Sequence, residues 1–460
     1  MSSRIQLRSG AWYGDRQIEL EIPSDWELNV HRPHTPPPLT DAQIESSLDR
    51  PDGQTPVRNL CKGKSRPLII VDDLNRPTPA DRVVGLLLKY FSEAGLPPER
   101  VTVLMATGTH GDPAPDAMSK KIGVEAAARC RTIIHNCFRG AVRMGTSSFG
   151  TPVYVNKAVA ESDFVIGIGG LNPNHTAGFG GGSKLALGVL GIRSIFRLHF
   201  GHPSAGWGSD GTESTFRRDI NEIAEMIGLR TVISLHVDEN REIVAIQCGD
   251  SRKYFPAAVK FCRDAFAAPS PGDADVVISD AYPNDLSLTF ARMKGFVPLQ
   301  SCKAGASRVV IASLPEGVGL HNLFPFVNVP RFHRQRHRLR RLSMMTPRQV
   351  ASAVFSKVSR TLTSSRRRSG GSNGQGPESG LAFKNPIRLF RPGNQTPALA
   401  SAIGGIQLTS SWEEIIQAIK SEQNHRTNLK VVVYPCAFLQ SLQPSTESTG
   451  KIPITEHSGE

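Results

Sequence analysis

Short apolar segments alternate with helical stretches between residues 66 and 189, and this alternation limits the possible folds more than any other feature of the chain. Four strand candidates read PLIIVDD, RVTVLMATGTH, RTIIHNC and SDFVIGIGGL, and a helix is predicted near residues 80–94 after the first of them. Apolar strands separated by helices predict an α/β layer with a largely parallel sheet. Polar residues follow three of these strands, at the edge where such sheets gather ligands.

A second unit of the same kind begins near Asp273. It reads DADVVISDAYP, then a helical stretch near 286–296, then SRVVIASLPEGVG, and the pattern resumes later with WEEIIQAIKSE and LKVVVYP. We therefore expect two α/β domains, over 1–265 and 270–460, with the active site in the cleft between them. A basic, partly disordered insert at about 331–395 is expected to interrupt the second domain.

The net charge of +13 comes from 54 Lys and Arg against 41 Asp and Glu. Twelve of the basic residues lie between 331 and 368 with no acidic residue among them, so removing them leaves +1 for the rest of the chain. A nearly neutral body argues against specific binding of nucleic acid. A basic amphipathic helix over 346–363 is compatible with contact to a membrane, but we favour a solvated insert.

The seven cysteines are scattered and contain no C-x-x-C pair, which argues against a disulfide framework and favours a reducing compartment. The first residues alternate apolar and polar side chains instead of showing a basic start and an apolar core, so they predict strands and no signal peptide. No apolar run approaches the roughly 18 residues of a membrane span. We expect a soluble, cytoplasmic protein.

The densest signal is the glycine-rich stretch over 169–200. Lys184 lies among five glycines, at positions 178, 180, 181, 182 and 188. Such a loop can approach a ligand closely and present its N–H groups to an anion. A phosphate-binding P-loop is excluded, because Ser183 and Leu185 stand where that motif needs Gly and Ser or Thr, and the spacing of a dinucleotide fingerprint fails too.

Three histidines accompany this stretch. His175 precedes Lys184 by nine positions, His199 follows it by fifteen, and His110 comes after another predicted strand. Imidazoles serve as general acids and bases near neutral pH, or as metal ligands. Their positions after strands and beside a glycine loop favour a functional role over a structural one.

Five motifs in this order resemble the lactate racemase family, whose members use a nickel-pincer nucleotide. They are DDLNRPTP at 72–79, ATGTHGDP at 106–113, HTAGFGGGSK at 175–184, the histidine after GIRSIFRL, and YPNDLSLTFARMKGF at 282–296. The resemblance covers most of the chain from about residue 15 to 330. It implies an isomerase with a cofactor-binding N-terminal domain.

The resemblance also implies which residues hold the cofactor. The lysine that carries the nickel-pincer nucleotide covalently matches Lys184, and Asp73 matches an aspartate that supports the cofactor. The nickel-ligating histidine matches His199, with His202 as an alternative because the spacing is one residue shorter than usual in the family. The loop glycines expected to contact the cofactor are Gly178, Gly181 and Gly182.

For catalysis, the resemblance implies that His110 and His175 are the two acid–base histidines, and that Arg76 and Lys294 bind the substrate carboxylate. Such an enzyme is a racemase or epimerase of a 2-hydroxy acid that works by reversible hydride transfer through a planar 2-keto acid. Two histidines are needed because the two enantiomers present their hydroxyl groups in different directions. The expected partners are a small 2-hydroxy acid and cofactor-maturation proteins.

Two questions stay open at this point. Ala291 stands where the family often has glutamine, so lactate, malate, aryl-lactates and sugar acids all remain candidate substrates. The alternative function is a catalytically silent family member that binds an acidic metabolite or the cofactor.

Overall fold

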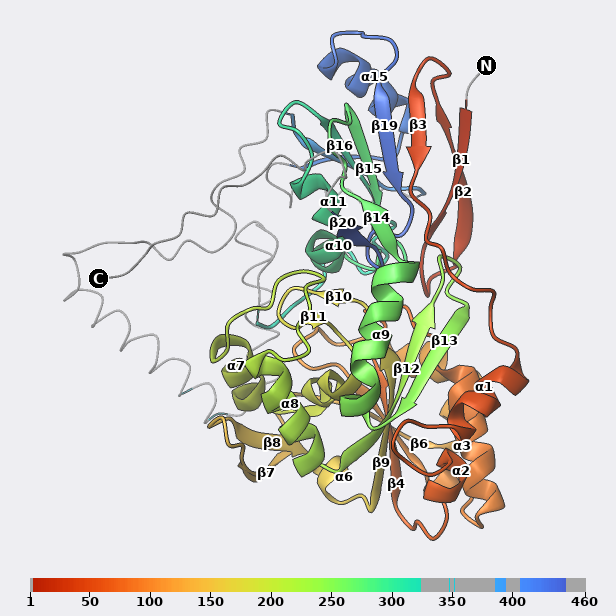
Figure 1. The fold of residues 1–460 in the computed structure, drawn as a ribbon, viewed down its shortest axis with the longest axis vertical. Coiled ribbons are helices and arrows are strands. Elements are labelled where there is room, and N and C mark those ends of the chain that lie inside the picture. The colour runs from red at the N-terminus through yellow and green to blue at the C-terminus, as the bar shows by residue number, and fades with distance from the viewer. Residues whose placement is uncertain (1–2, 324–346, 348–350, 352–384, 394–405, 444–460) are drawn as a thin grey trace, which may run out of the picture.

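The computed structural model describes residues 3–323, 347, 351, 385–393 and 406–443, and its strands include two six-stranded sheets (Figure 1). The first has the order β13-β12-β9-β4-β5-β6. Its strands are β4 (Pro67–Asp72), β5 (Thr102–Ala106), β6 (Arg131–Ile134), β9 (Phe164–Gly170), β12 (Leu229–Val237) and β13 (Ile243–Gly249). Neighbouring strands are parallel except β12 and β13.

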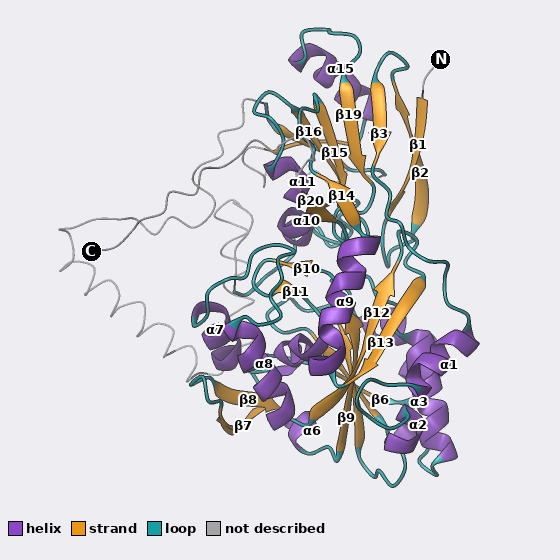
Figure 2. Cartoon of the chain, in the orientation of Figure 1, coloured by secondary structure: helices purple, strands orange, loops and turns teal. Residues whose placement is uncertain are grey.

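Helices lie on both flanks of this sheet, which explains why its inner strands β4, β5 and β9 are mostly apolar and buried. Strand β4 is buried from end to end, as expected of a parallel strand covered on both faces. Figure 2 shows one group of helices beside the sheet on one flank and a second group on the other, with α9 in front. The first group is α1 (Asp41–Asp49), α2 (Val57–Leu60) and α3 (Asp81–Glu93); the second includes α7 (Ile192–Phe200) and α8 (Thr215–Met226); α9 is Ser251–Ala265.

The second sheet has the order β18-β17-β16-β15-β19-β3, and all its pairs are parallel. Its strands are β3 (Glu27–Val30), β15 (Val276–Asp280), β16 (Ser307–Ile311), β17 (Ile387–Phe390), β18 (Ile406–Thr409) and β19 (Lys430–Tyr434). Its described helices are α10 (Leu288–Gly295), α11 (Val297–Gln300) and α15 (Trp412–Glu422). The predicted α/β class is confirmed.

The first thirty residues belong with the second sheet. Strand β3 pairs with β19, and the hairpin of β1 (Ser3–Ser9) and β2 (Arg16–Ile22) packs its buried Ile5, Leu7 and Leu20 against that sheet's apolar residues. The division of the chain into domains at 1–265 and 270–460, and the cleft between them, stay predictions. The basic segment 331–368 lies almost wholly outside the described residues.

Smaller elements connect these layers. They are η1 (Pro98–Arg100), α4 (Ala117–Ile122), α5 (Val124–Arg129), β7 (Ala141–Thr146), β8 (Pro152–Asn156), α6 (Lys157–Ala160), β10 (Pro173–Asn174), β11 (Gly178–Phe179), η2 (Gly182–Val189), β14 (Ala267–Pro269) and β20 (Ser441–Gln443). Across the described ranges, no helix is both long and apolar enough to pass through a membrane. The cytoplasmic location stays a prediction.

Candidate active site

Two buried aspartates with different partners stand at the end of β4 and at the start of the loop that follows it. Asp72 accepts hydrogen bonds from the Lys121 ammonium at 2.8 Å and from the Gly170 backbone at 2.7 Å, and Thr78 Oγ1 also donates to it. These contacts join the end of β4 to α4 and to the end of β9. Asp72 therefore fixes the loop, and its neighbour Asp73 is left to face the candidate site.

Asp73 is paired with His110. The Oδ2 atom of Asp73 lies 2.6 Å from Nδ1 of His110, and the carboxylate is almost wholly buried. Burial alone would raise the pKa of Asp73, but the charge and hydrogen bond of His110 lower it. Arg76 and Asn75 act in the same direction, and the resulting pKa is about 2. An ionised carboxylate beside Nδ1 favours the tautomer of His110 that carries its proton on Nδ1.

His110 also contacts the second half of the chain. Its ring centroid lies 4.8 Å from that of Phe290 and 5.4 Å from that of His321. The backbone N–H of Gly111 donates to Leu320 O at 2.9 Å, and that of Asn322 donates to Thr109 O at 2.7 Å. A short antiparallel bridge between 109–111 and 320–322 thus holds His110 from both sides.

Helix α10 touches the other predicted acid–base histidine. Nε2 of His175 lies 3.3 Å from the carbonyl oxygen of Met293, and its ring lies 4.9 Å from that of Trp207. Phe290 and Met293 are three residues apart on α10, and His175 contacts the helix through the Met293 backbone. The structure therefore places His110 and His175 along the same helix.

Lys294 is on that helix too. Its ammonium donates to Asn172 Oδ1 at 2.8 Å and to Pro173 O at 3.2 Å, both in the segment after β9, and lies 3.9 Å from the centre of the Phe438 ring. Burial, and next the positive charges of Arg76 and Lys184, lower the pKa of Lys294 well below its ordinary value. Lys294, Arg76 and Lys184 are therefore close enough to repel one another.

Lys184 lies in η2, directly after the glycines, and is half-buried. Burial, and next the charges of Arg76 and Arg217, lower the pKa of Lys184 to about 7. About half of such an amine is uncharged at neutral pH, and the neutral form is the nucleophile. Covalent attachment of a cofactor at Lys184 stays a prediction.

The two candidate nickel ligands differ in what holds their rings. Nδ1 of His199 donates to Ile195 O at 2.9 Å, one helical turn back on α7. Burial and the charge of Lys184 lower the pKa of His199 to about 4, so the ring is neutral. In His202 both ring nitrogens have protein partners, Asp219 Oδ2 at 2.8 Å and Thr215 Oγ1 at 3.2 Å. His199 as the nickel ligand, with His202 as the alternative, stays a prediction.

The glycines of the loop pack against the protein's own backbone. Gly181 has a φ of +81°, and a Cβ there would lie 2.9 Å from Gly170 O; Gly178 has a φ of +70° and abuts Ser209 O. Gly182, at a φ of +58°, lies against Phe255. The turn requires glycine at these positions for its own conformation, and contact with a cofactor stays a prediction.

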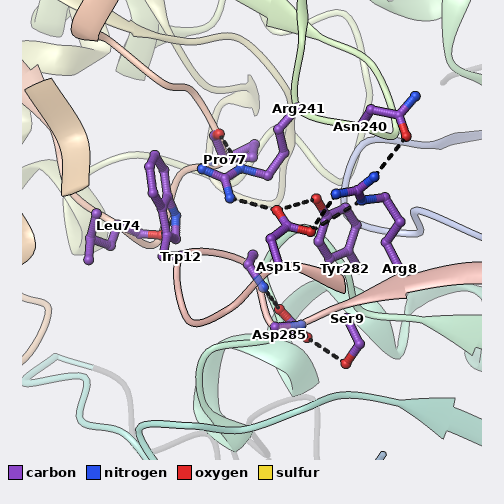
Figure 3. A network of polar contacts seen from close by, with 12 residues as sticks. Arg8, Ser9, Trp12, Asp15, Leu74, Pro77, Asn240, Arg241, Tyr282 and Asp285 are labelled. Atoms are coloured by element: carbon purple, nitrogen blue, oxygen red, sulfur yellow. Dashed lines mark hydrogen bonds and ion pairs between the residues drawn. The ribbon is translucent and has the colours of Figure 1, made fainter. Parts of the chain in front are cut away.

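A polar network contacts Leu74 and Pro77, in the loop that also carries Asp73 and Arg76 (Figure 3). Asp15, in the turn of the β1–β2 hairpin, accepts hydrogen bonds from Arg8, Arg241 and the Tyr282 hydroxyl, each at 2.9 Å. Arg241 also donates to Pro77 O at 3.1 Å, and Trp12 Nε1 donates to Leu74 O at 2.9 Å. The loop is thereby tied to the hairpin and to the YPND segment of the second half.

Three residues near this site were not predicted from the sequence. His321 follows β16 in the way that the other histidines follow strands, so the same signal could have found it. Trp207 and Arg217 had no sequence signal, because their proximity to Lys294 and Lys184 depends on how a loop and α8 pack. Among the described residues, no three His, Cys, Asp or Glu side chains form a metal-binding group by themselves.

Comparison with known proteins gives the same family as the motifs. Residues 13–208 match the model of the lactate racemase N-terminal domain. A lactate racemase of Lactiplantibacillus plantarum is 26% identical over 329 residues, covering 68% of this chain and 76% of that protein. A lactate racemase of Thermoanaerobacterium thermosaccharolyticum is 26% identical over 286 residues, covering 60% and 66%.

Solved structures share the fold. The lactate racemase apoprotein from Thermoanaerobacterium thermosaccharolyticum superposes with a TM-score of 0.67 at 19% identity, covering 96% of this chain and 100% of that one. A crystal structure of a Thermotoga maritima protein gives a TM-score of 0.53 at 16% identity, covering 89% and 100%. The chain thus contains a region similar to the lactate racemase N-terminal domain, resembles two lactate racemases in sequence, and shares the fold of a lactate racemase apoprotein.

Proposed function

We propose that the protein is a racemase or epimerase of a small 2-hydroxy acid, with lactate as the first substrate to test. The observation that carries the proposal is the Asp73–His110 pair, which lies with His175 along α10 and within electrostatic reach of His199. The names of the two curated relatives support a racemase that acts on lactate.

In the proposed mechanism, cations of the site bind the substrate carboxylate. Arg76 offers a planar fork that matches both oxygens of a carboxylate, and Lys294 adds a second charge. The low pKa of Lys294 results from burial and from the two cations beside it. A bound carboxylate offsets that repulsion, so binding of substrate and protonation of Lys294 are coupled. This coupling would favour acids over neutral analogues.

Proton transfer is assigned to the two histidines. Nε2 of His110 takes the hydroxyl proton from one enantiomer and returns it to the product of the reverse reaction, while Asp73 stabilises the imidazolium that forms. His175, from the segment between β10 and β11, does the same for the other enantiomer. The 2-keto acid is planar at C2, so it can be reduced from either face.

The residues present fit a nickel-pincer nucleotide. His199 would ligate the metal through Nε2, Lys184 would hold the cofactor covalently, and Asp73 would support it. When bound, this cofactor supplies a hydride acceptor and donor for C2 of the substrate. The Phe290 and Phe438 side chains lie beside His110 and Lys294 and limit the access of water to the site.

The test is co-expression with the maturation proteins for the cofactor, followed by peptide mass spectrometry and measurement of nickel. We expect a mass adduct on the peptide that contains Lys184, one nickel per chain, and conversion of one lactate enantiomer to the racemate. An unmodified Lys184 together with no nickel would overturn the mechanism.

The substrate is identified with a panel of chiral 2-hydroxy acids and sugar acids. Malate and aryl-lactates belong in the panel because Ala291 leaves more room than the glutamine common in the family. Turnover of any member supports the racemase. An adduct with no turnover across the panel would favour the silent family member that only binds the cofactor or an acidic metabolite.

A further inference from the structure

Arg217 is a buried arginine for which the proposed function has no role. It lies on α8 with 2% of its surface exposed, and its guanidinium carbon is 3.8 Å from the centre of the Phe255 ring. Among the described residues it has no carboxylate partner. A buried cation without a counter-charge is costly, so a reason for its presence should be sought in the groups that it touches.

Those groups belong to the turn that precedes Lys184. The guanidinium donates to Phe179 O at 2.7 Å and to Gly181 O at 3.1 Å. The same Gly181 oxygen accepts the backbone N–H of Lys184 at 3.2 Å. One carbonyl thus joins the side chain of Arg217 to the backbone of the candidate attachment residue.

The charge of Arg217 also acts on the amine. Burial lowers the pKa of Arg217 only to about 9, so the guanidinium stays protonated at neutral pH. The other titratable groups that interact with Lys184 are Arg76 from the β4–α3 loop, Lys294 from α10 and His199 from α7. Arg76 and Arg217 both oppose a positive charge on Lys184, and within the described part of the chain no carboxylate acts on it in the other direction.

We propose that Arg217 is the positioning residue of Lys184: its guanidinium fixes the carbonyls of the glycine-rich turn and its charge keeps the amine ready to react as a neutral nucleophile. This inference rests on the proposed function, in which Lys184 carries the cofactor. It assigns a role in cofactor loading to a residue that touches neither substrate nor metal in that mechanism.

The test measures the reactivity of Lys184 in the full-length apoprotein. The protein is produced without the maturation proteins and acetylated with acetic anhydride in short pulses between pH 5.5 and 9.5. The modification of each lysine is quantified by peptide mass spectrometry, with exposed Lys62 as the reference and fully buried Lys121 as a reporter of folding. In the wild-type protein, Lys184 should reach half its maximal rate near pH 7.

The variants separate charge from packing. Arg217→Gln keeps donors for the two carbonyls but removes the charge, and we expect its profile to move up by about one pH unit, which is roughly tenfold slower labelling at pH 6. Arg217→Lys keeps a charge and should stay near the wild-type profile. The matched control is Arg218→Gln, at an exposed neighbouring position on the same helix. This variant should leave the pH profile of Lys184 labelling unchanged.

A wild-type profile in Arg217→Gln, or an equal shift in Arg218→Gln, would overturn the proposal. If Arg217→Gln exposes Lys121 to labelling and is therefore unfolded, Arg217→Lys decides: a profile near wild type supports the proposal, and one that follows Lys62 contradicts it. Labelling needs no cofactor. Loss of the Lys184 adduct after co-expression would therefore reject the proposed function without producing the same result here.

Discussion

At the scale of single residues, the candidate site is a cluster of cations with Asp73 held among them. Arg76, Lys184 and Lys294 repel one another, and burial acts against all charges there. Such a site lowers the energy of a bound carboxylate and disfavours neutral ligands. Asp73 also holds the neighbouring imidazole of His110 in a defined orientation.

The first prediction concerns that carboxylate. Asp73→Asn should lower kcat at least about 100-fold, because the amide cannot hold a proton on Nδ1 of His110 or stabilise its imidazolium. Substrate binding should change much less, since Arg76 and Lys294 remain. Steady-state kinetics on the cofactor-loaded protein check this, and a kcat within a few-fold of wild type would show that His110 works without Asp73.

The low pKa of Asp73 also predicts that the free energy of unfolding depends on pH. The pKa of Asp73 is about 2 in the folded protein, below its ordinary value of 3.8, so its contribution is present above about pH 4 and is lost as the pH falls through 2. The free energy of unfolding of the wild type should exceed that of Asp73→Asn by about 2 kcal/mol at pH 6. Urea unfolding between pH 2 and 6 should show this gap closing on the acid side, and a constant gap would contradict it.

For the two candidate nickel ligands, His199 and His202, we predict opposite effects of substitution by alanine on nickel retention. His199→Ala should abolish nickel retention and leave the stability of the apoprotein within about 1 kcal/mol. His202→Ala should retain nickel but lose about 2 kcal/mol, because it leaves the buried Asp219 carboxylate without that donor. Nickel content and chemical unfolding of both variants check the pair. Retention of nickel by His199→Ala with loss by His202→Ala would reverse the assignment.

At the scale of elements, the β1–β2 hairpin braces the loop that carries Asp73 and Arg76. Its turn places Asp15 against Arg241, which holds the Pro77 carbonyl, and against the Tyr282 hydroxyl of the second half (Figure 3). The hairpin itself rests on the second sheet. An element distant from the candidate catalytic residues in sequence therefore sets the position of their loop.

Asp15→Asn tests this arrangement. The change removes the negative charge between Arg8 and Arg241, and we expect a loss of about 2 kcal/mol in unfolding free energy. We also expect a higher KM with a smaller change in kcat, because Arg76 shifts with its loop. The matched control is Asp25→Asn, an exposed aspartate of the same N-terminal region, which should leave both quantities unchanged. Equal KM values in the two variants would show that the network does not position Arg76.

Much of the architecture was predictable because it depends on local pattern. The apolar run PLIIV, followed by Asp72, forms β4, and the helices expected near 80–94 and 286–296 appear as α3 and α10. The pairing of β3 with β19 was not predictable, because four half-exposed residues carry no signal for a partner four hundred positions away. The approach of His321 to His110 likewise depends on a bridge between distant segments.

At the scale of the whole molecule, contacts between the two halves of the chain define the candidate site. Lys294 reaches Asn172, His175 reaches Met293, and the backbone of 109–111 pairs with 320–322. Each of these contacts joins a residue assigned to catalysis or substrate binding to the other half. The position of the histidines is thus coupled to how the two halves pack.

Gly111 tests that coupling. A Cβ at this position would lie 3.0 Å from Leu320 Cβ, so Gly111→Ala should push 320–322 away from the segment that carries His110. We expect a fall in kcat of about tenfold, since small displacements of an acid–base group are costly. Global stability should change little, because each sheet keeps its own core.

Gly85→Ala is the control: it is an exposed helix position with open space around its Cβ, and it should leave kcat unchanged. Steady-state kinetics and thermal unfolding of both variants test this prediction. An unchanged kcat in Gly111→Ala would mean that His110 keeps its position without the bridge, and that the halves contribute to the site independently.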